Sequence, residues 1–236
     1  MFTITKKFST IMFALLIIYA AGDMKFSLTK NKDQTQTGET IQLPDPNISG
    51  SVSVENAISK RRSVRNFQNK SLTLQQISQL LWSAQGITSR DGLRAAPSAG
   101  ALYPLEIYVV AGNVENLDPG VYRYIPKQNQ LIKTSEGDKR SELVSAASNQ
   151  EWIADAPVLF VFSVIYERTT GKYGQRGIRY VHMDTGFAGE NLFLQAVALN
   201  LSSVVVGAFR DEQVKRVLLL DENENPMIIM PVGYKR

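Results

Sequence analysis

The apolar residues of this chain predict helices and strands in mixed order from about residue 52 onward. Four of them recur at the spacing of one helix face: Ile77, Leu80, Leu81 and Ala84. Thr73 and Gln76 form a capping box just before this run and Gly86 follows it, so the run is expected to be a helix. Ser53 is a helix-capping residue type as well, and it predicts a short helix through Ser59.

Longer apolar runs predict the strands of a sheet. Residues 157–165 are apolar on both faces of an extended chain, which indicates a buried strand. A strand is also expected at 105–111, and a hairpin around Pro126. Further strands are expected at 121–125, 131–133, 204–206 and 227–231. The valine run at 204–206 predicts a second buried strand, which ends at Gly207.

One long helix is expected at 179–200, where small and large side chains are interspersed. Small residues allow another helix or a partner subunit to approach closely. Shorter helices are expected at 138–147 and at 211–219, the second capped by Asp211. Loops are expected near Arg90 and at 169–176. Helices and strands do not alternate strictly, so the predicted class is α+β rather than a doubly wound parallel sheet.

Composition narrows the chemistry. The 236 residues suffice for one domain with a full core, and the net charge of +4 comes from scattered basic residues, so nucleic-acid binding is not expected. The chain has no cysteine, which excludes disulfides, thiol nucleophiles and cysteine-bound zinc. His182 is the one histidine, so a multi-histidine metal site is excluded. A packing or hydrogen-bonding role is expected for His182 rather than catalysis.

The N-terminus predicts an export segment. Lys6 and Lys7 precede the apolar run 11–21, which is shorter than the roughly 20 residues of a spanning helix and ends in small residues. A cleaved signal peptide over 1–22 is favoured over an uncleaved membrane anchor, and an amphipathic helix is disfavoured because the run has no polar face. Residues 23–51 are predicted to be a polar linker, and 52–236 the folded domain.

Two motifs carry the candidate chemistry. Arg61-Arg62-Ser63-Val64-Arg65 combines guanidinium groups with a hydroxyl, a set that suits a phosphate. The segment 97–104, with sequence Pro-Ser-Ala-Gly-Ala-Leu-Tyr-Pro, is a stiff turn of small residues against which a flat aromatic ring could lie. Together they suggest a flavin mononucleotide (FMN) site. A nuclear-type signal or a solvated helix end is the alternative for the basic run.

Four segments in this order resemble the nitroreductase-like family of FMN-dependent oxidoreductases: 61–65, 97–104, 186–201 and 207–209. The likeness spans residues 52–236 and is strongest to the branch of thiazole- and oxazole-forming (SagB-type) dehydrogenases. It implies a nitroreductase-like α+β fold, with a mainly antiparallel central sheet flanked by helices, in a homodimer. Glu190 and Asn200 depart from the family pattern, which has Gln and Gly there. Asn tolerates the left-handed conformation that ends a helix.

The resemblance implies a site divided between two copies of the chain. Arg61 and Ser63 are expected at the FMN phosphate, and Arg62 either joins them or faces solvent. Arg65 is expected near the pyrimidine edge of the ring, where a cation favours the reduced anion. A surface ion pair is the alternative for Arg65. From the other subunit, the ring is expected to contact Pro97, Ser98, Ala99 and Gly100.

The remaining expected site residues come from later in the chain. Gly207 and Ala208 are expected to offer backbone N–H groups toward N5 or O4 of the flavin, unless Gly207 is a plain strand-end turn. Lys235 or Arg236, with Arg236 preferred, is expected to reach the phosphate. Lys172 and Tyr173 resemble a pair linked to proton removal in the azoline-oxidising branch; an exposed loop pair is the alternative reading.

The predicted activity is an FMN-dependent oxidoreductase that exchanges hydride between a small-molecule substrate and flavin N5 by a ping-pong route. One version reduces nitroaromatics or quinones with NAD(P)H as donor, and the other oxidises a C–N or C–C bond. A non-catalytic flavin-binding envelope protein and a flavin-fragmenting enzyme are the alternatives. The predicted location is exported or membrane-anchored if residues 1–22 are a signal, and cytoplasmic otherwise.

Overall fold

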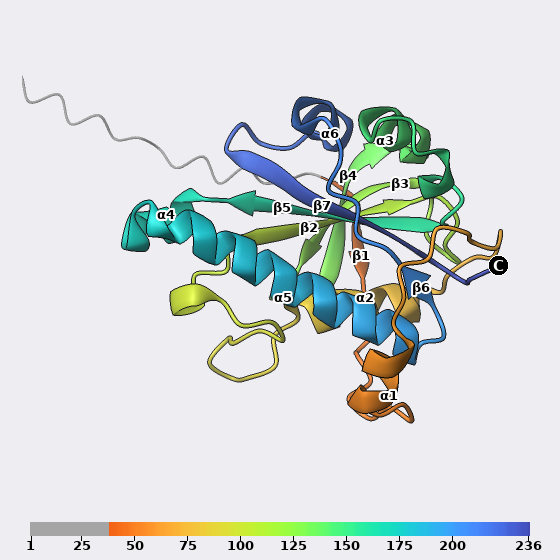
Figure 1. Cartoon of the computed structure of the whole chain (residues 1–236), viewed down its shortest axis with the longest axis horizontal. Coiled ribbons are helices and arrows are strands. Elements are labelled where there is room, and N and C mark those ends of the chain that lie inside the picture. The colour runs from red at the N-terminus through yellow and green to blue at the C-terminus, as the bar shows by residue number, and fades with distance from the viewer. Residues whose placement is uncertain (1–37) are drawn as a thin grey trace, which may run out of the picture. The chain divides into compact units, whose positions relative to one another are not determined.

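A seven-stranded sheet forms the centre of the computed structural model, which describes residues 38–236 (Figure 1). The strands are β1 (Thr40–Gln42), β2 (Leu105–Ala111), β3 (Gly120–Ile125), β4 (Gln130–Glu136), β5 (Val158–Ile165), β6 (Ser202–Ser203) and β7 (Glu224–Gly233). Their order in the sheet is β1-β4-β3-β2-β5-β7-β6, and the pairs are antiparallel. The predicted α+β class with an antiparallel sheet is confirmed.

Helices cover both faces of this sheet (Figure 1). The helices are α1 (Val54–Lys60), α2 (Leu74–Gln85), α3 (Arg140–Ala146), α4 (Glu167–Tyr173), α5 (Arg176–Ala198) and α6 (Asp211–Leu218). One core lies under α2 and α5 and includes Ile107 and Phe160; the other lies under α3 and α6 and includes Tyr108 and Val161. Alternate residues of β2 and β5 therefore enter different cores, which explains why both strands are apolar on both faces.

The long helix α5 packs closely on the sheet because one of its small residues faces β7. A Cβ added at Gly189 would lie 3.2 Å from the Cδ1 of Ile228 and 3.7 Å from the sulfur of Met230. A larger side chain at this position would push α5 away from the strand. The helix begins at Arg176, three residues before the predicted start at 179, and the predicted loop at 169–176 is mostly α4.

The predicted helix ends are confirmed at three positions. The Oγ of Ser53 accepts a hydrogen bond from the Asn56 backbone N–H at 3.2 Å. Thr73 and Gln76 form the reciprocal capping box, with bonds of 3.2 and 3.0 Å. Asn200 has a φ of 58°, the left-handed conformation that asparagine tolerates after a helix.

Two local predictions are wrong. Residues 204–206 are not a buried strand: β6 is limited to Ser202–Ser203, and the side chain of Val205 is 43% exposed. After Ser203 the chain leaves the edge of β7, and only Val206 pairs with the sheet again. Asp211 does not cap α6, because Arg210 occupies the N-cap; Asp211 lies in the first helical turn, where a negative charge favours the helix dipole.

Part of the predicted linker packs on the domain. β1 pairs with β4, and Leu43 is almost fully buried in the core. The side chain of Gln79 accepts a hydrogen bond from the backbone N–H of Asn47 at 2.7 Å. Residues 40–47 therefore differ from the expected linker, while the predicted signal segment and residues 23–37 lie outside the described residues. Between residues 38 and 236, no helix is long and apolar enough to cross a membrane.

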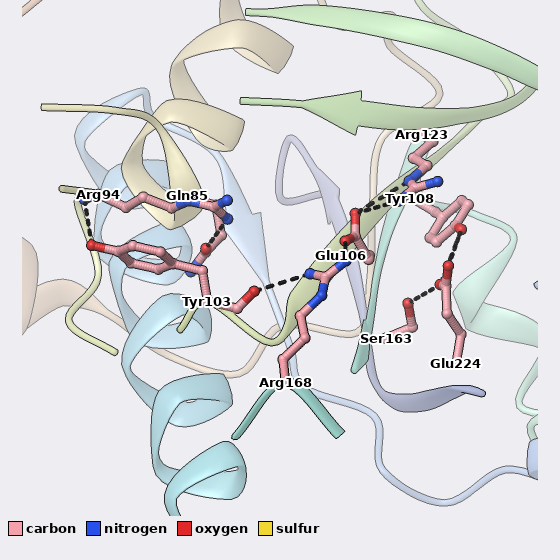
Figure 2. Close-up of polar contacts among 9 residues, drawn as sticks. All are labelled: Gln85, Arg94, Tyr103, Glu106, Tyr108, Arg123, Ser163, Arg168 and Glu224. Atoms are coloured by element: carbon pink, nitrogen blue, oxygen red, sulfur yellow. Dashed lines mark hydrogen bonds and ion pairs between the residues drawn. The ribbon is translucent and has the colours of Figure 1, made fainter. Parts of the chain in front are cut away.

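A buried carboxylate lies where β2, β5 and β7 meet (Figure 2). Glu224 is fully buried and accepts hydrogen bonds from the Ser163 hydroxyl at 2.7 Å and from the Tyr108 hydroxyl at 3.0 Å. Burial raises the pKa of Glu224, although the Ser163 hydrogen bond and the positive charge of Arg123 oppose the shift.

This raised pKa predicts a pH-dependent effect of Glu224→Gln on stability. When the pKa of a carboxyl group rises on folding, the folded state loses stability as the pH increases from the unfolded pKa of the group, about 4.3, through its folded pKa. The Gln variant has no such loss. Its free energy of unfolding relative to wild type should therefore increase as the pH is raised above about 4.3 in chemical denaturation. The exposed Glu222→Gln is the control, and an equal pH response of both variants would contradict the prediction.

Candidate functional site

The arginine motif leaves α1 and runs along the free edge of the sheet. The backbone N–H of Arg61 ends the helix by donating to the Ala57 carbonyl at 2.9 Å. Beyond it the chain is extended, and the backbone N–H of Val64 donates to the Ser203 carbonyl of β6 at 2.9 Å. Phe67 is fully buried and anchors the far end of the motif. The cationic side chains are thus presented by backbone that is fixed at both ends.

The three guanidinium groups have few acidic neighbours. Arg61 lies 3.7 Å from a carboxylate oxygen of Glu190 and 4.8 Å from the ring centre of Phe193. Arg62 donates only to main-chain carbonyls, and Arg65 lies over the Trp152 ring at 5.6 Å. Within residues 38–236, neither Arg62 nor Arg65 forms an ion pair, so the expected alternative of a surface ion pair for Arg65 finds no partner in this part of the chain.

Glu190, one departure from the family pattern, contacts Arg61. A carboxylate at this position offers Arg61 a partner about half exposed to water, where an ion pair is worth little. The distance of 3.7 Å between the two charged groups leaves the guanidinium free to bind a second anion more tightly. Glu190 therefore lies beside Arg61 without neutralising the cluster.

The C-terminal residues lie beside the arginine motif. The backbone N–H of Arg236 donates to the Asn66 carbonyl at 3.1 Å, and Lys235 pairs with Phe67. The structure thus brings the backbone of Arg236 to the same edge of the sheet as Arg61 and Ser63. Ser63 itself is exposed, and its backbone pairs with Ser203.

Gly207 and Ala208 lie at the same corner. Both are exposed, and a Cβ added at Gly207 would meet no atom within 4 Å. The Ala208 carbonyl accepts a hydrogen bond from the side chain of Gln150 at 3.4 Å. The short 3₁₀ turn η2 (Glu151–Ile153) follows Gln150 and carries Trp152, over which Arg65 lies, so this turn links the two groups of predicted residues.

The small-residue turn is held by a carboxylate of α5. The Ser98 hydroxyl donates to Asp184 at 2.7 Å, the Ala99 N–H lies 3.3 Å from the same oxygen, and the Tyr103 N–H donates to the Ser98 oxygen at 3.0 Å. Asp184 is nearly fully buried, and burial raises its pKa while these hydrogen bonds oppose the shift. Sequence reasoning missed Asp184. Its signal was an acidic residue beside the small residues of the predicted long helix, a feature that Glu190 shares.

Lys172 and Tyr173 lie against this turn. Gly100, in the short 3₁₀ segment η1 (Ala99–Ala101), has a φ of 65°. A Cβ added there would lie 2.8 Å from the Tyr173 hydroxyl and 3.1 Å from the Lys172 amine. The pair belongs to the last turn of α4 rather than to a loop, and Tyr173 packs edge-on against Tyr180. The structure therefore joins two groups of residues that were predicted separately.

Other sequence candidates have plainer surroundings. Pro97 is exposed at the start of the turn. His182 lies on the exposed side of α5, with its Nε2 2.9 Å from the Tyr166 hydroxyl. No set of three or more acidic or histidine side chains is grouped as a metal site would require, as far as residues 38–236 are concerned.

The arginine motif and the turn occupy different positions along α5. The turn contacts the helix at Asp184, whereas Arg61 contacts it at Glu190 and Phe193. At about 1.5 Å per residue, these contacts are roughly 9 to 14 Å apart along the helix axis. In Figure 1, α1 lies near the C-terminal half of α5 and the yellow-green turn near its N-terminal half. One chain therefore does not bring the two motifs into direct contact.

The donor set at the arginine corner fits the phosphate of FMN. Three arginines, a serine and the terminal Arg236 lie along one edge of the sheet, and the fork of arginine donors matches phosphate oxygens in pairs. Exposed backbone at Gly207 and Ala208 leaves space beside this corner. The residues present can therefore hold the group.

Comparison with known proteins identifies the family to which this α+β chain belongs. The Nitroreductase family model matches residues 58–234, so the chain belongs to the nitroreductase family. A Methanocaldococcus jannaschii protein named as a nitroreductase, MJ1384, is 41% identical over 198 residues, which cover 84% of this chain and 98% of that protein. The Escherichia coli microcin B17-processing protein McbC is 30% identical over 71% of this chain and 65% of its own length.

A solved structure shows the same fold. The crystal structure of a protein from Ralstonia eutropha JMP134, also named as a nitroreductase, has a TM-score of 0.74 and 28% sequence identity. The match covers 84% of this chain and 90% of the other. The predicted family and the predicted nitroreductase-like fold are thus confirmed.

Loss of the Ser98 hydroxyl should destabilise the turn. Ser98→Ala leaves the buried Asp184 without its shortest hydrogen bond, which should cost about 1–3 kcal/mol of unfolding free energy. The cost should be larger when Asp184 is ionised, because the lost donor served the charged form. Chemical denaturation at several pH values measures both effects, with the exposed Ser51→Ala as control. A loss no greater than that of the control would contradict the role assigned to Asp184.

Proposed function

We propose that this protein is an FMN-dependent oxidoreductase that acts on a small-molecule substrate as a homodimer. Bound FMN would supply hydride exchange at N5, in a ping-pong sequence with two substrates. The observation that carries the proposal is the cationic corner, where Arg61, Arg62 and Arg65 lie with a single carboxylate nearby. Membership of the nitroreductase family supports it.

Each residue of the corner has a distinct role in this proposal. Arg61, Arg62, Ser63 and Arg236 bind the phosphate. Arg65 supplies positive charge at the pyrimidine edge of the ring, where it would raise the reduction potential by favouring the anionic reduced form. Gly207 and Ala208 offer backbone N–H groups to the opposite edge, and their lack of bulk keeps that edge accessible.

The turn at 97–100 is proposed to come from the second copy of the chain. Exposed apolar groups support such a dimer: Met183 and Phe187, one turn apart on α5, are 49% and 48% exposed. A hollow of about 720 Å³ lies between the segment before α1 and helices α2 and α5, and Ile48 and Leu194 are among the residues that line it. A second copy that covers these surfaces would carry its own Pro97-to-Gly100 turn toward the arginine corner.

Lys172 and Tyr173 are proposed to move a proton at the substrate. Their polar atoms lie against Gly100, in the turn that the flavin would contact, so both lie within reach of a substrate on the ring. The Lys172 amine lies 5.4 Å from the centre of the Tyr173 ring, so two groups that can carry a proton lie at one place. This arrangement supports an oxidising, SagB-type reaction, and similarity to McbC points the same way.

A second version of the reaction is favoured by the similarity to MJ1384. Here the protein would reduce nitroaromatics or quinones with NAD(P)H as the donor. Single-turnover measurements separate the versions: reduction of bound flavin by NAD(P)H supports the reductase, and reduction by an azoline-containing substrate supports the dehydrogenase. Flavin that is never reduced indicates a non-catalytic binding protein, and flavin that is consumed indicates a fragmenting enzyme.

We also propose export or membrane anchoring through residues 1–22, which subcellular fractionation tests.

Replacement of Arg61 should weaken FMN binding. Arg61→Met removes charge-assisted hydrogen bonds worth about 1.5–3 kcal/mol each, so the Kd for FMN should rise roughly tenfold to more than a hundredfold. Fluorescence titration of the cofactor-free protein measures the change. Arg90→Met, an exposed arginine far along the sequence from the motif, is the matched control. Equal FMN affinity of both variants, or no binding by the wild-type protein, would contradict the proposed site.

A further inference from the structure

A second cationic pocket lies away from the arginine motif, at the end of the sheet where β2 begins and the β3–β4 hairpin turns. Its volume is about 410 Å³. Residues from several elements line it, among them Gln85 at the end of α2, Arg168 in α4 and Lys127 in the hairpin. Figure 2 shows three of its arginines, Arg94, Arg123 and Arg168, around the Tyr103 and Glu106 side chains. None of the three arginines belongs to the proposed flavin site, although Tyr103 lies in the segment 97–104.

The charges that line this pocket are unbalanced. Its lining includes four cationic side chains, Arg94, Arg123, Lys127 and Arg168, but one carboxylate, that of Glu106, which leaves a formal charge of +3. That carboxylate is already shared. One of its oxygens lies 2.6 Å from Arg168, and the other lies 3.0 Å from Arg123.

Arg94 has no carboxylate partner within the described part of the chain. Its guanidinium donates to the amide oxygen of Gln85 at 2.8 Å and stacks 4.4 Å above the Tyr103 ring. Burial lowers the pKa of Arg94, and the charge of Arg168 lowers it further, against the opposing effect of Glu106. A partly buried charge is costly when no opposite charge is paired with it. An anion in the pocket would remove that cost.

We propose that this pocket binds a small organic oxyanion, a molecule with two or more carboxylate or phosphate charges. Guanidinium forks bind both groups in pairs, and the unused donors of Arg94 and Arg168 can serve one ligand. The volume lies near the lower end of the roughly 300–1,000 Å³ of small-molecule sites. The apolar residues of the lining suit a short hydrocarbon body: Leu102, Leu105, Ile107, Ile125 and Pro126.

The pocket is joined to the small-residue turn through Tyr103. The Arg94 backbone N–H donates to the Tyr103 hydroxyl at 3.1 Å, and Arg168 donates to the Tyr103 carbonyl at 3.0 Å. The Tyr103 N–H in turn donates to the Ser98 oxygen. An anion that draws Arg94 or Arg168 toward itself therefore acts on a residue bonded directly to the turn.

Calorimetric titration with citrate and with inorganic phosphate, at constant ionic strength, tests the proposal. The protein is first saturated with FMN, so that any anion site at Arg61 is filled; if the protein binds no FMN, an Arg61→Met variant replaces this step. We expect saturable binding of citrate, weakened about tenfold or more by Arg94→Met and unchanged by Arg90→Met. Phosphate should compete if the site recognises the shared oxyanion chemistry.

A second variant keeps the test informative if Arg94→Met does not fold. Lys127 is exposed in the hairpin, so Lys127→Met should leave the fold intact and still weaken citrate binding. Circular dichroism and thermal melting check the fold of each variant. Absence of saturable binding, equal affinity in the Arg94→Met and Lys127→Met variants and the wild type, or loss only in the Arg61→Met variant would overturn the proposal.

Discussion

The close contact between α5 and the central sheet is the constraint on which the candidate site depends. Gly189 allows the helix to approach β7, and the position of the helix then determines where its other side chains lie. Asp184 holds the small-residue turn from one part of the helix, and Glu190 and Phe193 hold Arg61 from another. Displacement of this helix would therefore move both motifs, although they contact it at different residues.

The contacts of α5 also separate the two parts of the proposed flavin site within one chain. The turn and the arginine corner are fixed to the same rigid helix at different heights, so ordinary side-chain movement cannot bring them together. The proposed homodimer would supply both parts if its two-fold axis placed the turn of one chain beside the corner of the other. The exposed Met183 and Phe187 are a physical reason to expect that such a copy is present.

Local patterns in the sequence predicted much of the fold. β5 could be predicted because a continuous apolar run identifies a strand buried on both faces, and the Thr73 capping box because its two partners are three residues apart. The strand predicted at the valines 204–206 is absent because pairing with a neighbouring strand, rather than β propensity, decides where an edge strand ends. β1 was missed because its few apolar residues are stabilised by the distant β4.

The candidate site, like the fold, could be predicted from the sequence only in part. The arginine motif and the turn are contiguous in sequence and could be recognised, whereas Asp184 acquires its role only through a contact with Ser98, 86 residues away. The anion pocket was invisible for the same reason, since Arg94, Glu106, Arg123 and Arg168 meet only when the sheet end and α4 are folded. Long-range contacts between polar groups leave no period in the sequence.

Mixed dimers test the central claim, that two copies of the chain build one flavin site, most directly. Chains carrying Arg61→Met and chains carrying Ala99→Trp, with different affinity tags, would be co-expressed and the mixed dimer isolated through both tags. The account predicts that each variant alone binds little FMN, whereas the mixed dimer binds one FMN per two chains, because one of its two sites has both wild-type halves. Mixed dimers that bind no more FMN than their parents, or a monomeric chain that binds FMN fully, would contradict it.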